Sequence, residues 1–206
     1  PMMYFRGNGF YPFALDWQEQ SNGRHIVPGL GIYFLHPDEG NWTTEEVERQ
    51  MHFIRSNRLA GEAHNGQRIR WKPPTAATTS HDLLLDHFYQ YPALQPPMPW
   101  IDNVSPTAPS ALKAVSAGDG YTRLNWKAAT DNDKQNAPMY VVYASDTYPV
   151  DITNPENILV QNLRDTHYIY APILPWTARK YFAVTAGTAV EMKVRQLNKK
   201  KNNHLF

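Results

Sequence analysis

The chain has 206 residues, enough for one large domain or two small ones. Hydrophobic residues make up 42% and charged residues 19% of it, which supports a buried core and argues against disorder throughout. The absence of cysteine excludes disulfides, thiol nucleophiles and cysteine-based zinc sites. No apolar run is long enough to cross a bilayer as a helix, so we expect no membrane span.

Charge is distributed unevenly along the chain. The formal net charge is +1, but residues 193–206 contain five basic residues and no acidic one. Residues 1–192 therefore hold 15 basic and 19 acidic residues, a net charge of −4. An acidic body with a short basic end is not typical of nucleic-acid-binding proteins, so we expect no nucleic-acid partner and read the lysine run as a solvated tail.

Three segments in the first hundred residues have strand patterns. Residues 1–5 look like the end of a strand, and residues 59–64 form a short run of small and polar residues. Residues 25–35 are apolar, β-branched and aromatic, which predicts a strand buried on both faces. Pro28 counts against a regular central strand, so we expect this one to be bent.

Helical patterns lie between these strands. A threonine N-cap and a first turn crowded with glutamates predict a helix over residues 44–57. Val47, Met51 and Ile54 recur at helical spacing and give this helix one apolar face. Residues 80–89 form a second candidate helix with a serine cap. Alternating strands and helices predict a parallel sheet.

The pattern changes near residue 101, where short alternating strands separated by turn residues begin. This spacing favours a β-sandwich over residues 102–197, followed by a basic tail over 198–206. The candidate strands are residues 111–117, 122–127, 139–144, 158–161, 167–173, 179–186 and, less regular, 190–197. We expect Trp126 to lie in the sandwich core.

Several motifs of this second part resemble those of fibronectin type III domains. A proline-rich entry, PTAPS, covers residues 106–110, and LNW at 124–126 supplies a second-strand tryptophan. YVVY at 140–143 and YFAVTA at 181–186 supply the third-strand and sixth-strand patterns. The resemblance implies an all-β sandwich.

The first part resembles the C-terminal end of the glycosyl-hydrolase-like family 10 domain, a bacterial (β/α)8-barrel family. The motifs are PMMYF at 1–5, IVPGLGIYFLHPDEGNW at 26–42, LAGEAH at 59–64 and PPMPWID at 96–102. The resemblance implies that residues 1–101 are the last strands and helices of a TIM-type barrel. The expected fold is therefore α/β plus all-β: a partial barrel joined to a fibronectin type III-like sandwich.

This interpretation carries expectations about the whole protein. A first residue of proline is not a translation start, so we expect a fragment of a longer chain. No signal peptide is visible, yet the family implies an extracytoplasmic bacterial location, periplasmic or at the cell surface. A partial barrel would expose an unpaired strand edge, through which the chain could self-associate.

Three acidic residues are candidates for catalysis at the carboxyl ends of these strands, where barrel enzymes place their sites. Glycoside hydrolysis needs two facing carboxylates. Glu62 is the first candidate, because it lies among small residues; a structural salt bridge is the alternative. Asp38 and Glu39 follow the second strand, where turn formation also explains an aspartate. The family's acids lie on upstream strands, which implies that this chain alone is inactive.

Substrate contacts are expected from aromatic and polar residues near the same ends. Sugar rings pack on aromatic faces, and 15 of the 26 aromatic residues lie in residues 1–101. Packing in the core is the alternative for each aromatic. The candidates for substrate binding are Tyr4, Arg6, His36, Trp42, His64 and Trp71.

Two hypotheses of function follow. The first is a piece of a glycoside hydrolase that acts on a polysaccharide by carboxylate acid/base chemistry. The second is a non-catalytic carbohydrate-binding or spacer protein. No nucleotide-binding or zinc-protease motif occurs, so we expect no cofactor and no metal site.

Overall fold

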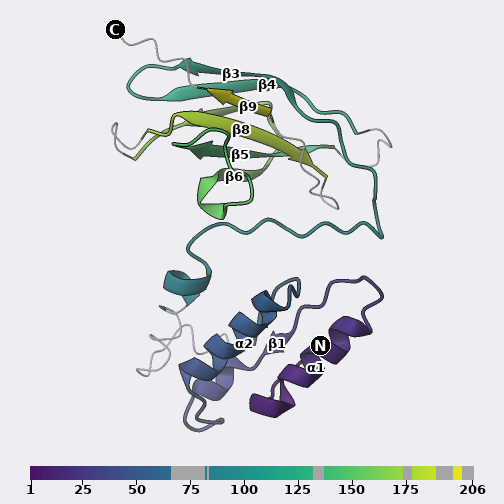
Figure 1. Cartoon of the computed structure of the whole chain (residues 1–206). Coiled ribbons are helices and arrows are strands. Elements are labelled where there is room, and N and C mark those ends of the chain that lie inside the picture. The colour runs from purple at the N-terminus through teal and green to yellow at the C-terminus, as the bar shows by residue number, and fades with distance from the viewer. Residues whose placement is uncertain (66–81, 83, 132–136, 174–177, 189–196, 201–206) are drawn as a thin grey trace. The chain divides into compact units, whose positions relative to one another are not determined.

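The computed structural model describes residues 1–65, 82, 84–131, 137–173, 178–188 and 197–200 (Figure 1). The chain divides into two compact units, Pro1–Gln90 and Tyr91–Phe206. Each unit has a hydrophobic core of its own among the described residues. None of the described helices has the length and apolar character that crossing a bilayer requires.

The N-terminal unit packs two helices against a very short parallel sheet (Figure 1). Strand β1 (Gly29–Leu30) pairs in parallel with β2 (Ala63–His64), and Met2 forms a parallel bridge to Gly29 on the other side of β1. The helices are α1 (Tyr11–Glu19) and α2 (Thr44–Ser56), and single turns are η1 (Gly7–Gly9), η2 (Ile32–Leu35) and η3 (Leu84–Phe88).

Helix α2 confirms the sequence prediction. Thr43 is its N-cap. Glu45 and Glu46 lie in its first turn, where their negative charges interact favourably with the positive end of the helix dipole. Val47, Met51 and Ile54 are buried on one face. They join Met3, Phe10, Ala14, Leu30, Ile32, Leu35 and Phe88 in the core of this unit.

The predicted strand over residues 25–35 is mostly wrong. Only Gly29–Leu30 is a strand, and Ile32–Leu35 turns into a 3-10 helix. Pro28 has no N–H for a ladder bond, although its carbonyl accepts from the Ala63 N–H at 2.9 Å. Gly31, with φ −82° and ψ 64°, bends the chain out of the extended conformation. Helix α1 was not predicted; Ala14 is its sole buried residue in the described structure, so its apolar pattern is weak.

The prediction of a partial (β/α)8 barrel is wrong. In the described parts of the chain, the parallel pairing consists of β1, β2 and the Met2 bridge, whereas the other two sheets are antiparallel. A barrel needs eight tilted parallel strands that close on themselves. Here the apolar run breaks after two paired residues, and the core is completed by α1, α2 and the turn η3.

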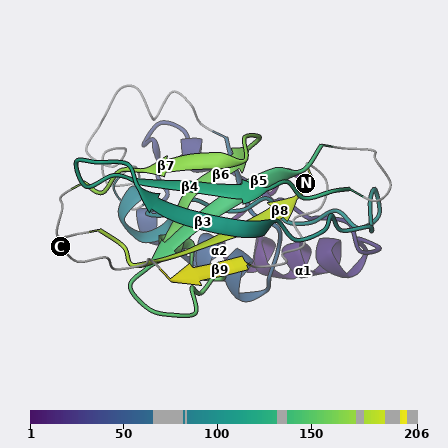
Figure 2. The same cartoon turned by 90° about the horizontal axis from the view of Figure 1, so that it is seen from above.

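The second unit is built from two antiparallel sheets. One has the order β3 (Ser110–Ser116), β4 (Thr122–Lys127), β7 (His167–Tyr170). The other has the order β6 (Ile158–Leu163), β5 (Met139–Ser145), β8 (Tyr181–Gly187), β9 (Leu197–Lys200). Figure 2 shows β3, β4 and β7 side by side in front of the strands of the other sheet.

A shared core joins these two sheets into a sandwich. Alternate residues of β4 point inward, and Trp126 is 6% exposed, as predicted. Its ring meets that of Tyr140 from the other sheet at a centroid distance of 5.5 Å. The buried members of this core are Leu112, Leu124, Trp126, Ala129, Tyr140, Val142, Ala144, Tyr170, Phe182, Val184 and Ala186.

Six predicted strands of this unit are found within a few residues of their expected bounds. The last differs, because β9 is Leu197–Lys200, and most of the predicted 190–197 lies outside the described residues. The short η4 turn (Pro155–Asn157) precedes β6.

Candidate functional site

A hollow of about 560 Å³ lies on one face of the short parallel sheet in the N-terminal unit. The other face of this sheet carries Met3 and Leu30 into the core, as strand alternation requires. The hollow is lined by Pro1, Met2, Tyr4, Val27, Gly29, Ala63, His64 and Asn65. It brings together Tyr4 and His64, two residues predicted from sequence to bind substrate.

Tyr4 is held in this hollow by two contacts. Its hydroxyl accepts a hydrogen bond from the Asn65 side-chain amide at 2.9 Å. Its ring meets Tyr33 edge to face, with ring centroids 5.7 Å apart. Gly29 leaves room beside it, since a methyl group there would touch the Tyr4 ring at 3.6 Å. The hollow therefore presents an aromatic ring, a phenolic hydroxyl and a primary amide to a ligand.

Glu62 is engaged with Tyr89, which the prediction did not include. The Tyr89 hydroxyl donates to Glu62 Oε1 at 2.5 Å. Burial and, next, the hydrogen bond to this carboxylate raise the pKa of Tyr89 well above its ordinary value. The Tyr89 ring also lies 6.0 Å from His64, centroid to centroid. Glu62 thus bonds the tyrosine whose ring lies beside His64.

Arg55 fixes the segment that carries Tyr89. Its Nη2 donates to the carbonyl of Phe88 at 2.6 Å, and its guanidinium lies 4.6 Å from the centre of the Phe88 ring. It also lies 5.9 Å from the Tyr89 ring. A cation over two aromatic faces and a backbone bond anchor η3 to α2.

His36, Asp38 and Glu39 form a turn. The Asp38 N–H donates to His36 Nδ1 at 3.2 Å, and the Glu39 N–H donates to the His36 carbonyl at 3.1 Å. The Asp38 carboxylate lies 3.6 Å from the same imidazole nitrogen. These contacts agree with the turn that the sequence allowed, and none of the three residues lines the hollow.

The remaining predicted residues lie apart from the hollow as well. Trp42 stacks on Phe34 at 4.8 Å and packs against the core, so its ring has a structural partner. Arg6 is exposed and precedes η1, where its carbonyl accepts from the Gly9 N–H. Trp71 lies outside the described residues.

The expectation of a glycosidase loses its structural basis here. It rested on a barrel that would bring two carboxylates together about 5–9.5 Å apart. Among the described residues, no carboxylate lines the hollow, and Glu62 is paired with Tyr89 instead. A catalytic role for Glu62, Asp38 and Glu39 stays a prediction.

Asn65 is the residue of the hollow that sequence reasoning missed. It directly follows the 59–64 run, and the ends of parallel strands carry functional side chains. That position was the available signal.

In the described part of the chain, no group of three or more histidine, aspartate or glutamate residues could hold a metal ion. Comparison with protein-family models and with curated proteins finds no match to this chain.

Proposed function

We propose that this protein binds carbohydrate without cleaving it, and that the hollow beside Tyr4 is the sugar site. The observation that carries the proposal is the hydrogen-bonded pair of Tyr4 and Asn65 in the lining of one hollow. A volume of about 560 Å³ lies within the range of small-molecule sites, about 300–1,000 Å³.

The chemistry of these side chains suits a polyol. An amide offers two donors and an acceptor, a phenol offers one donor and an acceptor, and hydroxyl groups need such mixed partners. The Tyr4 ring offers an apolar surface to the C–H face of a sugar. Val27, which is 41% exposed, and Met2, which is 77% exposed, widen that apolar surface.

The absence of acids supports binding over hydrolysis. Bond cleavage needs a carboxylic acid and a carboxylate at the scissile bond. The described lining residues include no acid, so they can hold a neutral sugar without a group to protonate the leaving oxygen.

A glycan array with the full chain, followed by calorimetry on the best glycan, tests it. We expect Asn65→Ala and Gly29→Ala to weaken binding about tenfold, because one removes a hydrogen-bonding amide that costs about 1–1.5 kcal/mol and the other fills part of the hollow. Tyr121→Ala, at an exposed tyrosine of the second unit, is the matched control. If no glycan binds, or if Asn65→Ala and Gly29→Ala both bind like the parent, the proposal is wrong and a spacer role replaces it.

A further inference from the structure

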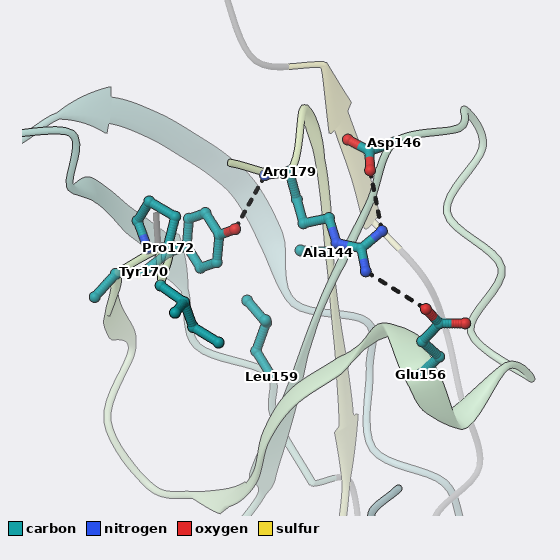
Figure 3. A pocket seen from close by; sticks show the side chains of 9 residues that line it. Ala144, Asp146, Glu156, Leu159, Tyr170, Pro172 and Arg179 are labelled. Carbon is teal, nitrogen blue, oxygen red and sulfur yellow. Dashed lines mark hydrogen bonds and ion pairs between the residues drawn. The ribbon is translucent and has the colours of Figure 1, made fainter. Parts of the chain in front are cut away.

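A second pocket, of about 470 Å³, lies in the sandwich at the side where two sheet edges approach each other (Figure 3). One edge is β6, the outer strand of the four-stranded sheet, and the other is β7, the outer strand of the three-stranded sheet. Leu159 of β6 and Tyr170 of β7 both line the pocket. It is therefore an opening between the layers of the sandwich.

The walls of this pocket are apolar. Ala144 is 1% and Tyr170 6% exposed, and both belong to the sandwich core. Pro172 and Ile173 continue the wall outward, and Ile173 is 95% exposed. A ligand with a short aliphatic chain would bury apolar surface against these residues.

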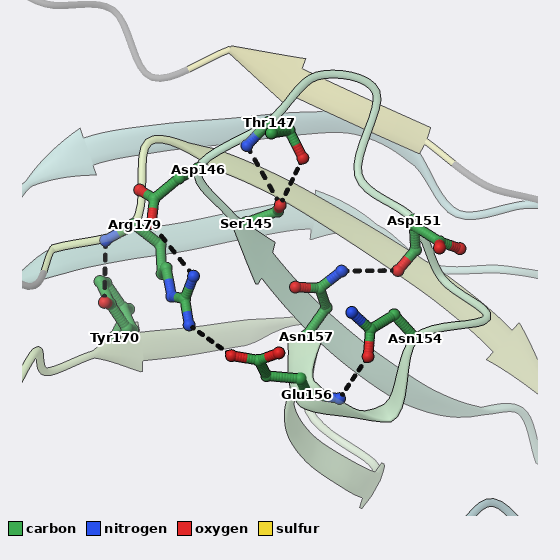
Figure 4. A network of polar contacts seen from close by, with 9 residues as sticks. All are labelled: Ser145, Asp146, Thr147, Asp151, Asn154, Glu156, Asn157, Tyr170 and Arg179. Carbon is green, nitrogen blue, oxygen red and sulfur yellow. Dashed lines mark hydrogen bonds and ion pairs between the residues drawn. The ribbon is translucent and has the colours of Figure 1, made fainter.

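The rim of the pocket is charged. The Arg179 guanidinium bonds Asp146 Oδ2 at 3.0 Å and lies 3.6 Å from Glu156 Oε1 (Figure 4). The backbone N–H of Arg179 donates to the Tyr170 hydroxyl at 3.0 Å. One guanidinium between two carboxylates leaves the rim with a formal charge of −1, and both carboxylate side chains are about half exposed, at 54% and 48%.

Local hydrogen bonds order the chain segments that carry both carboxylates (Figure 4). Beside Asp146, the Ser145 hydroxyl accepts from the Thr147 N–H at 3.1 Å. The Glu156 N–H donates to the Asn154 side chain at 3.0 Å, and the buried Asn157 donates to the Asp151 carbonyl at 2.8 Å. The rim is therefore formed before any ligand arrives, which lowers the entropy cost of binding.

We propose that this pocket binds a lysine side chain of a partner protein. A lysine combines a four-carbon stem, which matches the apolar walls, with an ammonium group that keeps contact with water and charge. The ammonium would lie against the exposed oxygens of Asp146 and Glu156, where the net charge of the rim attracts a cation and repels a carboxylate or phosphate. The site is in a different unit from the proposed sugar hollow and does not depend on it.

Titration of the full chain with Nα-acetyl-lysine-N-methylamide, whose side-chain ammonium is free, tests the proposal. Binding is monitored by NMR of the backbone amides. We expect saturable shifts at Ala144, Leu159 and Arg179. The neutral probe Nα-acetyl-norleucine-N-methylamide keeps the four-carbon stem and lacks the ammonium group. It should bind at least about fivefold more weakly, the factor expected for two half-exposed charge contacts. This comparison uses the parent protein, so it needs no variant to fold.

Two sets of variants test whether the two carboxylates cause the preference for lysine. The double variant Asp146→Asn/Glu156→Gln should lose the preference for lysine over norleucine, whereas Asp119→Asn, an exposed acid of the β3–β4 turn, should keep it. Equal binding of both probes to the parent, shifts confined to residues away from the pocket, or the same shifts with acetate would each overturn the proposal.

Discussion

The sandwich and the N-terminal unit are stabilised in different ways. Strands β5 and β8 pair along seven residues each, whereas β1 and β2 pair along two. The sandwich also has a core that both sheets share, with alternate residues of long strands facing each other. Regular backbone pairing and apolar burial therefore account for most of the stability of that unit.

The N-terminal unit depends more on individual polar contacts. Glu46, which is 7% exposed, accepts from the Gly7 N–H at 3.0 Å, from Gln50 at 2.8 Å and from Arg49 at 2.9 Å. Gln50 donates in turn to the Phe5 carbonyl at 2.9 Å. A carboxylate on α2 thus holds the loop before α1. Short parallel strands leave backbone that side chains must fix, so we expect the two units to respond to different perturbations.

Truncation in the sandwich core should have the largest effect. Phe182→Ala removes a fully buried ring that contacts Tyr170 at 5.4 Å, and we expect a loss of about 3–5 kcal/mol in the unfolding free energy of that unit. Hydrogen exchange measured segment by segment would show faster exchange in β4, β5 and β8. Ile169→Ala, at a residue 52% exposed on β7, should change little. An equal loss of hydrogen-exchange protection in α2 would contradict the expectation that the two units respond to different perturbations.

Removing the Glu46 charge should destabilise the N-terminal unit by about 2 kcal/mol, because Glu46→Gln weakens three hydrogen bonds to one buried group. Urea unfolding resolved by exchange in α1 and α2 measures it. Glu45→Gln is the matched control, since Glu45 is the exposed neighbour in the same turn. Equal effects of the two substitutions would show that the helix dipole, and not the buried network, is responsible.

Acid should act on the same network. Burial alone would raise the pKa of Glu46, but the hydrogen bonds from Gly7, Gln50 and Arg49 outweigh it and lower that pKa below the ordinary value of 4.5. The stabilisation is therefore complete above about pH 4.5 and is lost as pH falls through the folded-state pKa. Melting curves between pH 7 and pH 3 should show a steeper loss for the parent than for Glu46→Gln. Parallel curves would contradict the assignment.

Loss of the Arg55 anchor should cost the N-terminal unit about 1–2 kcal/mol, through the bond to the Phe88 carbonyl and the ring contact. Arg55→Lys keeps the charge but not the planar stack, so we expect it to recover less than half of the loss caused by Arg55→Ala. Exchange at Phe88 and Tyr89 is the readout. Full recovery by lysine would show that charge alone matters.

The smallest expected effect is at the Tyr89–Glu62 pair. Tyr89→Phe should change stability by less than about 1 kcal/mol, since the pair is solvent-accessible. The sharper readout is titration of Tyr89, by comparing the ultraviolet spectra of the parent and Tyr89→Phe with rising pH. Glu62→Gln should bring the raised pKa of Tyr89 closer to its ordinary value. An unchanged titration would mean that burial is the sole cause.

Local signals in the sequence predicted several elements well. The cap and the spacing of Val47, Met51 and Ile54 predicted α2, because helical periodicity is visible within one segment. Alternation and turn residues predicted six strands of the sandwich for the same reason. The run over residues 25–35 misled, because a short apolar run suits a strand, a turn or a buried coil equally well.

The candidate site was predicted only in part. Tyr4 and His64 do share a hollow, but Asn65 bonds Tyr4 across 61 residues of sequence. Tyr89, outside the lining of the hollow, bonds Glu62 across 27 residues. Trp42 has an aromatic partner in Phe34 that its sequence neighbourhood did not single out. Distances between remote segments depend on packing, which no local pattern records.

By itself, the sequence determined the helix α2, most of the antiparallel strands and the inward position of Trp126, since periodicity and turn chemistry act over a few residues. Only the tertiary structure decided that two paired residues, and not a barrel strand, follow Pro28, and that Glu46 reaches Gly7 while Arg179 joins Asp146 to Glu156. Those outcomes depend on which distant backbone and charged groups meet, and therefore on the packing of the whole unit.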